Sequence, residues 1–393
     1  MKEINLFDPE VRRNPYPAYS YLRNHPVQKV EPLGAWVLSR SQDIQYALRH
    51  PELFSSTAFR SIVAPEWCPE CPLADSPLTM DGPEHTKFRT LIGRAFTPSM
   101  IAQLEPRIRQ LAAAAADAMV GHDQVDFIQS FAVPFPAQAI AEILGLDPSL
   151  TPHFGVWADH IASISPIEPP PDYAKSVKQT VADMTQYIQE VIESRRQNPR
   201  GDIISLLIEA NIDGEHLDAS QVLGFMSLLL PAGFETTRHL LANIMLCFLN
   251  HPGLRRLRQD PAQIPSFIEE VLRFDPPVHS VARFTTQDVV VGDVSIPANS
   301  MVFILIGAAG RDSENIEDAE NFDPTREQRN LLSFGHGPHY CIGASLARLE
   351  ARVGVEELLK RFRGFEPGAP EPEWNISATV RGPLQLFVRP LSA

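Results

Sequence analysis

The residues best suited to chemistry in this 393-residue chain surround one cysteine in its C-terminal part. They read Phe334-Gly335-His336-Gly337-Pro338-His339-Tyr340-Cys341-Ile342-Gly343. Glycine adopts positive φ without steric cost, so its repeated use lets the backbone bend tightly and approach a flat ligand closely. A helix-forming stretch follows, and a thiolate at a helix N-terminus is stabilised by unpaired N–H groups and the helix dipole. The run therefore predicts a cysteine that ligates haem iron, whereas the alternative is a buried structural cysteine in a turn.

A second run lies upstream inside a long apolar stretch. It reads Leu228-Leu229-Leu230-Pro231-Ala232-Gly233-Phe234-Glu235-Thr236-Thr237. Ala232 and Gly233 are small enough for a flat group to approach the helix backbone. The Thr236 hydroxyl can bond the carbonyl of Ala232, which opens the helix locally, and Glu235 beside it can relay protons. The alternative is a helix–helix contact between small residues, with an incidental acid and hydroxyls.

Together the two runs resemble the haem-binding and oxygen-activation motifs of the cytochromes P450. The positions that the cysteine motif usually fixes are all filled, by Phe334, Gly335, Gly337, His339, Cys341 and Gly343. The resemblance implies a single domain over residues 1–393, mainly α with a small β region. It implies haem b between the 218–250 helix and the Cys341 loop, and a monooxygenase of the soluble bacterial type. Cys341 would ligate the iron, while Glu235 and Thr236 would be catalytic.

Four cations match the propionate-binding positions of the family. They are His85, Arg89, Arg283 and His339. His85 and Arg89 are four residues apart and share a helix face, and haem propionates favour Arg and His through charge-assisted hydrogen bonds. Taken singly, each could instead be a surface cation.

Glu270 and Arg273 are three residues apart, so they share a helix face and can form an ion pair. In the resembled family such a pair is buried and serves folding and haem incorporation. Asn321 stands where the family often has a cation, which leaves the third member of this group open.

Pro231 departs from the family pattern. A proline inside a helix lacks an N–H and clashes with the carbonyl four residues earlier, here that of Ser227, at a cost of roughly 3 kcal/mol. We expect it to deepen the kink at the oxygen-activation motif.

By resemblance, the substrate pocket is lined by mostly apolar residues, which favours a hydrophobic small molecule without identifying it. These residues are Phe59, Trp67, Leu73, Leu229, Val278, Val281 and Val380. Residues 57–79 would cover the pocket, and the proline-rich residues 166–171 would form a stiff lid. Cys68 and Cys71 lie in the covering loop, but no second Cys or His pair at suitable spacing supports a zinc site.

Bulk properties exclude several other classes of protein. The net charge of −14 disfavours nucleic acid as a partner, because phosphate binding needs a basic face. Four cysteines make no disulfide framework and fit a reducing cytoplasm. The N-terminus lacks the apolar core of a signal peptide, and no stretch of about 18 apolar residues predicts a membrane anchor.

The site residues must be positioned by a largely helical framework. Apolar periodicity and Pro/Gly stops predict helices at 84–95, 99–119, 126–143, 151–162, 172–197, 202–210, 218–250, 261–273 and 343–361. Short strands are expected at 35–38, 289–291, 294–296 and 301–306.

We expect no fused reductase within these 393 residues. By resemblance, electrons come from NAD(P)H through a separate ferredoxin or flavodoxin with its reductase, and Arg107, Arg109 and Arg348 could add positive charge to the docking face. Two alternatives stay open: a peroxygenase that takes peroxide directly, and a non-catalytic haem protein that binds a ligand. Glu235 and Thr236 favour oxygen activation over both.

Overall fold

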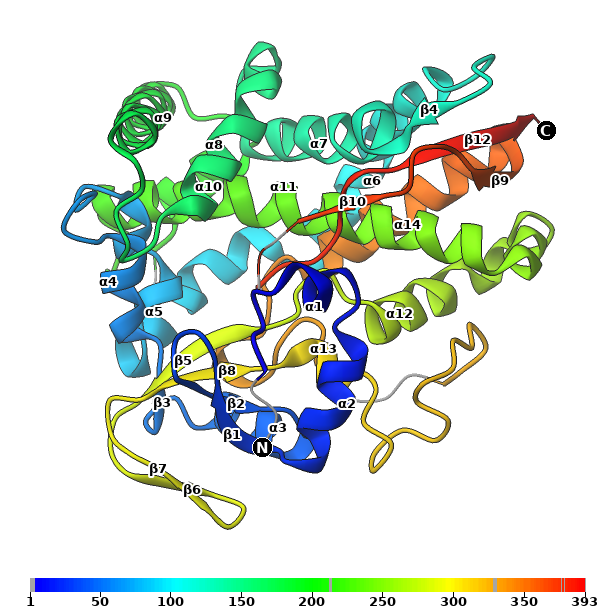
Figure 1. Cartoon of the computed structure of the whole chain (residues 1–393). Helices are drawn as coiled ribbons and strands as arrows, with labels where there is room; N and C mark the ends of the chain where they lie inside the picture. Colours follow the sequence, from blue (N-terminus) through cyan, green and yellow to red (C-terminus); the bar gives the residue numbers. More distant parts are fainter. Residues whose placement is uncertain (1–3, 212–213, 328–330, 376, 378, 393) are drawn as a thin grey trace. The chain divides into compact units, whose positions relative to one another are not determined.

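The computed structural model describes all residues except 1–3, 212–213, 328–330, 376, 378 and 393 (Figure 1). The chain divides into two compact units. Unit 1 comprises Met1–Phe54, Glu105–Phe135 and Thr236–Ala393, and unit 2 comprises Ser55–Leu104 and Pro136–Glu235. Helices α6 (Pro98–Asp117), α7 (Pro134–Leu144) and α11 (Ala219–Asn250) contribute residues to both units. The expectation of a single domain stays a prediction.

Unit 1 combines helices with short strands. Its helices are α1 (Pro9–Arg13), α2 (Tyr16–Asn24), α3 (Ser41–Arg49), α12 (Ile264–Phe274), α13 (Ile306–Ala309) and α14 (Ala344–Arg361). Its strands are β1 (Val27–Val30), β2 (Ala35–Leu38), β4 (Val125–Asp126), β5 (Val281–Thr285), β6 (Val289–Val291), β7 (Val294–Ile296), β8 (Met301–Ile304), β9 (Phe362–Pro367), β10 (Glu373–Trp374), β11 (Pro383–Gln385) and β12 (Phe387–Ser392). The short strand β3 (Phe54–Ser55) lies where the chain passes from unit 1 to unit 2.

A mixed sheet in unit 1 holds β1, β2, β8 and β5 in this order. Strands β2 and β8 run parallel, whereas β1 pairs with β2 and β5 pairs with β8 in antiparallel fashion. Successive side chains of a strand point to opposite faces. Leu38 of β2 therefore packs in an apolar cluster with Ile44 of α3, while Val37 packs in another with Tyr19 of α2. The sheet is fixed on both faces, and with it β5, which carries Arg283.

A buried ion pair joins α12 to the loop that leads toward the cysteine motif. The Arg273 guanidinium donates two hydrogen bonds of 2.7 Å to the carboxylate oxygens of Glu270, and both side chains are 0% exposed. The same guanidinium donates to the carbonyls of Gly310 and Ala319, both at 2.7 Å, and of Asn321 at 2.9 Å. Arg273 thus gathers three backbone carbonyls around one charge.

The third member of this group is not the Asn321 side chain. That amide donates a 2.7 Å hydrogen bond to Asp318, so Asn321 contributes only its carbonyl to Arg273. A second cation comes instead from Arg326, whose Nε lies 3.6 Å from a Glu270 carboxylate oxygen. Glu270 also accepts the N–H of Asp323 at 2.7 Å. Sequence reasoning did not identify Arg326, because an arginine in a loop carries no pattern of its own.

Unit 2 is helical. Its other helices are α4 (Arg60–Val63), α5 (Gly82–Gly93), α8 (Thr151–Ser163), α9 (Pro171–Gln197) and α10 (Ile203–Glu209). Helix α9 buries one apolar face, with residues recurring every three or four positions: Val177, Val181, Met184, Ile188 and Ile192. At its end Arg195 donates a 2.5 Å hydrogen bond to Asp202, the N-cap of α10, so one ion pair joins the two helices.

The helix expected over 126–143 is wrong in its first part. The structure has β4, a π-helical turn over Ile128–Ala132, and then α7. Pro134 and Pro136 have no N–H, so they cannot make α-helical bonds to the preceding turn. Instead the N–H of Val133 donates a 2.9 Å hydrogen bond to the carbonyl of Ile128. The two residues are five positions apart, which is the hydrogen-bond pattern of a π-helix.

Helix α11 continues unbroken through Pro231. Pro231 offers no N–H to the carbonyl of Ser227, so the helix lacks one bond there, and the expected kink stays a prediction. Although much of α11 is apolar, no helix within the described residues is long and apolar enough to cross a membrane.

Replacing Glu270 with Gln should destabilise the protein, because it leaves the buried Arg273 guanidinium without its counter-charge. Breaking a buried ion pair costs about 3–5 kcal/mol, and we expect the free energy of unfolding in urea to fall by about this amount. Glu193→Gln is the control, since Glu193 pairs with Arg196 at the same spacing on the exposed surface and should lose at most about 1 kcal/mol. Equal losses in the two variants would contradict this expectation.

Candidate functional site

Cys341 lies in a short loop that ends at α14. Its N–H donates a 2.9 Å hydrogen bond to the carbonyl of Phe334, which closes the loop. Gly335 and Gly337 have φ values of +76° and +69°, a region that residues with side chains rarely occupy. The thiol is exposed and shortly precedes Ala344, the first residue of an 18-residue helix. It therefore lies at the positive end of the helix dipole.

The position of this loop is set by α12 and α3. The Ser333 hydroxyl donates a 2.6 Å hydrogen bond to the carbonyl of Leu272 in α12. A Cβ at Gly337 would lie 2.4 Å from the carbonyl oxygen of Leu48 in α3, so a side chain there would collide with the backbone. The glycine is needed for this close approach as well as for its φ.

Two of the three arginines expected on the docking face, Arg348 and Arg109, are paired with carboxylates. Arg348 donates to both carboxylate oxygens of Glu269, at 2.5 and 3.0 Å, and its guanidinium lies 4.4 Å from the ring centroid of Phe334. Arg109 lies within 2.9 Å of carboxylate oxygens from three glutamates. Their charges are balanced locally, and a positive docking surface at these residues stays a prediction.

The second predicted motif lies in α11, where the units divide between Glu235 and Thr236. Ala232 is exposed, and Glu235 and Thr236 are half-buried. A Cβ at Gly233 would lie 2.8 Å from Cδ1 of Ile140 in α7, so this glycine permits close helix packing. The structure thus supplies a packing reason for Gly233, while its contact with a cofactor stays a prediction.

The four predicted propionate-binding cations are distributed over both units. In unit 2, His85 is buried and Arg89 is half-buried, one turn apart on α5. In unit 1, Arg283 lies in β5, where its Nη1 donates a 2.7 Å hydrogen bond to the carbonyl of Ala282, and His339 is half-buried in the cysteine loop. The structure brings His339 and Cys341 into one loop, and the propionate contacts stay predictions.

The predicted pocket residues also lie in both units. In unit 1, Val278 and Val380 face each other in an isolated antiparallel bridge, and Val281 begins β5. In unit 2, Phe59 is half-buried, and three further residues are buried: Trp67, Leu73 and Leu229.

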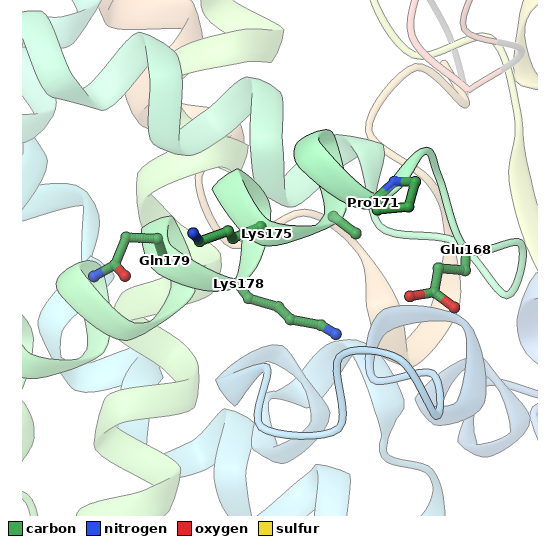
Figure 2. Close-up of a pocket in the computed structure, with 6 residues that line it drawn as sticks. Glu168, Pro171, Lys175, Lys178 and Gln179 are labelled. Atoms are coloured by element: carbon green, nitrogen blue, oxygen red, sulfur yellow. The ribbon is translucent and has the colours of Figure 1, made fainter.

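A groove of about 450 Å³ opens beside the N-terminal part of α9 in unit 2 (Figure 2). It is lined by Glu168, Pro171, Ala174, Lys175, Lys178 and Gln179. The Lys178 ammonium lies 6.0 Å from the ring centroid of Trp67, whose Nε1 donates a 2.8 Å hydrogen bond to the carbonyl of Ser165. This bond joins the loop over 57–79 to the segment just before the expected lid.

Cys68 and Cys71 are both buried in that loop. Burial raises the pKa of the Cys71 thiol to about 12, so it stays protonated at neutral pH. A protonated thiol is a poor nucleophile and a poor metal ligand. Within the part of the chain that is described, no group of three or more His, Cys, Asp or Glu side chains could hold a metal ion.

A buried polar network in unit 1 went unnoticed in the sequence. Asp275, the residue after α12, accepts two 2.8 Å hydrogen bonds from Arg381 and one of 2.5 Å from the Tyr16 hydroxyl. His279 lies 3.4 Å from Asp275, and its Nδ1 is 3.0 Å from the Tyr19 hydroxyl. The sequence shows only that Asp275 and His279 lie on either side of Val278, a predicted pocket residue. It does not reveal their hydrogen-bond partners, which are far away along the chain.

Comparison with known proteins decides the family. The cytochrome P450 family model matches residues 160–386. The chain belongs to the cytochrome P450 family. It is 35% identical to the vitamin D(3) 25-hydroxylase of Pseudonocardia autotrophica, over 97% of this chain and 95% of that one.

Two solved structures show the same fold as this cytochrome P450. CYP109Q5 from Chondromyces apiculatus is 36% identical with a TM-score of 0.91, covering 100% of this chain and 99% of that one. CYP109E1 from Bacillus megaterium in complex with corticosterone is 30% identical with a TM-score of 0.86, covering 97% and 99%. The expected fold class, the monooxygenase class and haem b as the cofactor are thereby confirmed.

The residues present fit a haem. Cys341 is the one exposed thiol of the four, and its thiolate form is a ligand that haem iron accepts. A Cβ at Gly343 would lie 3.9 Å from the Cys341 sulfur, an ordinary van der Waals contact, so Gly343 lies directly beside the thiol. Ala232 is exposed on α11, and its small side chain leaves room for a flat group near the helix backbone.

Acidification should destabilise this cytochrome P450 between about pH 6.5 and 4, because two buried histidines are neutral. Burial lowers the pKa of His279 to about 4 and of His239 to about 3, whereas an unfolded histidine titrates near 6.5. The unfolded state binds more protons in this window. The free energy of unfolding therefore decreases as the pH is lowered, by roughly 1.4 kcal/mol per pH unit for each histidine. Urea unfolding at pH 7 and 5 measures this. His279→Gln should flatten the dependence and exposed His25→Gln should not; an unchanged slope in His279→Gln would contradict the assignment.

Replacing Cys341 with Ser should abolish the thiolate signature of the ferrous–CO haem, because a serine hydroxyl is not ionised at neutral pH. The CO difference spectrum and the haem content per chain measure this. Ser345→Ala, at an exposed position in the first turn of α14, should leave the spectrum unchanged. A thiolate spectrum that persists in Cys341→Ser would rule out Cys341 as the ligand.

Proposed function

We propose that this cytochrome P450 hydroxylates, or otherwise oxidises, a hydrophobic small molecule with O₂ and two electrons from a separate redox partner. The observation that carries the proposal is an exposed cysteine at the N-terminus of α14, in a chain of this family. The apolar character of the predicted pocket residues supports a hydrophobic substrate. One relative is a vitamin D(3) hydroxylase and another binds corticosterone, so steroids and secosteroids are the first substrates to test.

In this proposal Cys341 holds the haem iron. When bound, the haem supplies the activation of dioxygen and the oxidation itself. His85, Arg89, Arg283 and His339 orient the cofactor through charge-assisted hydrogen bonds to its propionates.

In this proposal Phe334 and the adjacent backbone of the cysteine loop also contact the cofactor. Gly335, Ala232 and Gly343 contribute by having little or no side chain, which lets a planar group come near the backbone.

Protons are delivered by Glu235 and Thr236. The Thr236 hydroxyl can hold a water molecule by a hydrogen bond, and the half-buried Glu235 carboxylate can exchange its proton with solvent. Val278, Val281 and Val380 exclude other water from the substrate, which keeps proton transfer confined to the intended route.

The electron donor in this proposal is a ferredoxin or flavodoxin, reduced from NAD(P)H by its own reductase. A cytoplasmic location is also part of the proposal. It is supported by the three buried thiols, which suit a reducing compartment.

Thr236→Ala should lower the amount of product formed per NADPH consumed by about 10²-fold, the usual contribution of a positioned proton donor. The assay uses the holoenzyme with a surrogate ferredoxin, its reductase and NADPH, and compares product with NADPH oxidation for testosterone and vitamin D₃. Thr90→Ala is the control, because Thr90 is an exposed helical threonine of α5 whose hydroxyl donates a 2.8 Å hydrogen bond to the carbonyl of Thr86, four residues earlier. Full coupling in Thr236→Ala would contradict the assigned role.

The same assay separates the alternatives. Product from the wild-type enzyme with hydrogen peroxide, but none with NADPH and the ferredoxin system, would identify a peroxygenase. Saturable binding of these ligands without product from either oxidant would identify a non-catalytic haem protein.

A further inference from the structure

We propose that Asp275 and Arg381 are positioning residues that set the separation of Val278 and Val380, and thereby the size of ligand accepted at this wall of the pocket. The proposal rests on the proposed function, because it takes these two valines as pocket-lining residues. Every group involved lies in unit 1.

Two segments distant in the sequence meet at these valines. Three backbone hydrogen bonds of 2.7, 2.8 and 3.2 Å join residues 277–280 to residues 379–381. Val278 and Val380 occupy the antiparallel bridge within this contact. Such a short pairing has few bonds of its own, so its geometry depends on the side chains that flank it.

Arg381 fixes one side of the contact. Its Nη1 donates to both carboxylate oxygens of Asp275 at 2.8 Å. Its Nε and Nη2 donate to the carbonyls of Arg12 and Arg13 at the end of α1, at 3.2 and 2.8 Å. The guanidinium thus ties the segment of Val380 to both α1 and the end of α12. A lysine presents a single point charge and cannot reproduce these directions.

Asp275 and His279 fix the segment that carries Val278. One precedes Val278 in the chain and the other follows it. The Asp275 carboxylate also accepts the Tyr16 hydroxyl at 2.5 Å, and its backbone carbonyl accepts Nδ2 of Asn243 at 2.9 Å. His279 is fully buried, and a Cβ at Gly307 would lie only 2.9 Å from its Nδ1, so no slack remains around the ring. Val278 therefore lies between two anchored residues, Asp275 three positions before it and His279 directly after it, and we expect a change at Asp275 to alter its position.

A matched control exists in unit 2. Arg195 and Asp202 form a pair with side chains 5% and 9% exposed, against 5% and 15% for Arg381 and Asp275. Arg195 also donates to a backbone carbonyl, that of Gly145, at 2.6 Å. Neither residue adjoins a predicted pocket residue in the sequence.

The experiment measures ligand size selectivity in the holoenzyme without turnover. Imidazole, 4-phenylimidazole and clotrimazole bind haem iron in order of increasing bulk, and absorbance titration gives the three dissociation constants for each variant. Asp275→Asn and Arg381→Lys should change the clotrimazole-to-imidazole affinity ratio by about tenfold, the effect of a methylene-sized change in a pocket. Arg195→Lys should leave the ratio within about twofold, even if its thermal midpoint falls equally.

An unchanged ratio in both Asp275→Asn and Arg381→Lys, with a lowered thermal midpoint, would reduce the pair to a structural role and overturn the proposal. If neither variant folds with haem, Tyr16→Phe decides. It removes one hydrogen bond to Asp275 and keeps the ring, so it should shift the ratio in part; no shift would overturn the proposal. Failure of the proposed function shows differently, as no product from the wild-type enzyme in the NADPH assay, and leaves the azole ratios interpretable.

Discussion

The guanidinium of Arg273 is the group on which the geometry of the cysteine loop depends. It is wholly buried, so its donors must all be satisfied, and Glu270 together with three backbone carbonyls satisfies them. Those carbonyls belong to the segment after α13 that leads toward the cysteine motif. The same helix, α12, receives the Ser333 hydroxyl immediately before Phe334. Helix α12 therefore constrains the loop at two places, through the Arg273 charge along its approach and through the Leu272 carbonyl at its start.

This arrangement answers a requirement of the chemistry. A thiol that must bind a cofactor cannot be covered by its own chain, and Cys341 is exposed. Its position must then come from the backbone and from neighbouring elements. The hydrogen bond to Phe334 and the close approach of Gly337 to α3 provide this. The exposed Cys341 is thus held in place by the contacts that its loop makes with α12 and α3.

The network around Asp275 applies the same principle to an apolar wall. Apolar contacts are non-directional, so valines by themselves do not define a spacing. Hydrogen bonds to a planar guanidinium and a carboxylate are directional and are strengthened by burial. The network lies next to Val278 and Val380 in the chain and transfers its geometry to them through the backbone.

The cysteine loop and the helical framework were predictable from the sequence, because their determinants are local. Positive φ at Gly335, apolar periodicity along α9, and the three-residue spacing of Glu270 and Arg273 are each visible within one turn or one loop. The π-helical turn before α7 was missed because apolar periodicity outweighed the two prolines there.

Only the tertiary structure decided which distant groups meet. Arg381 and Asp275 are separated by 106 positions, and Tyr16 and Asp275 by 259, so no spacing rule connects them. Arg326 became the second cation beside Glu270, and Gly233 acquired a packing partner in Ile140, for the same reason. The sequence by itself predicted a cofactor ligand, Cys341, and determined the class of chemistry, since backbone conformation and side-chain type act locally. Burial and pairing of charges depend on the folded whole, and these set the geometry of the site.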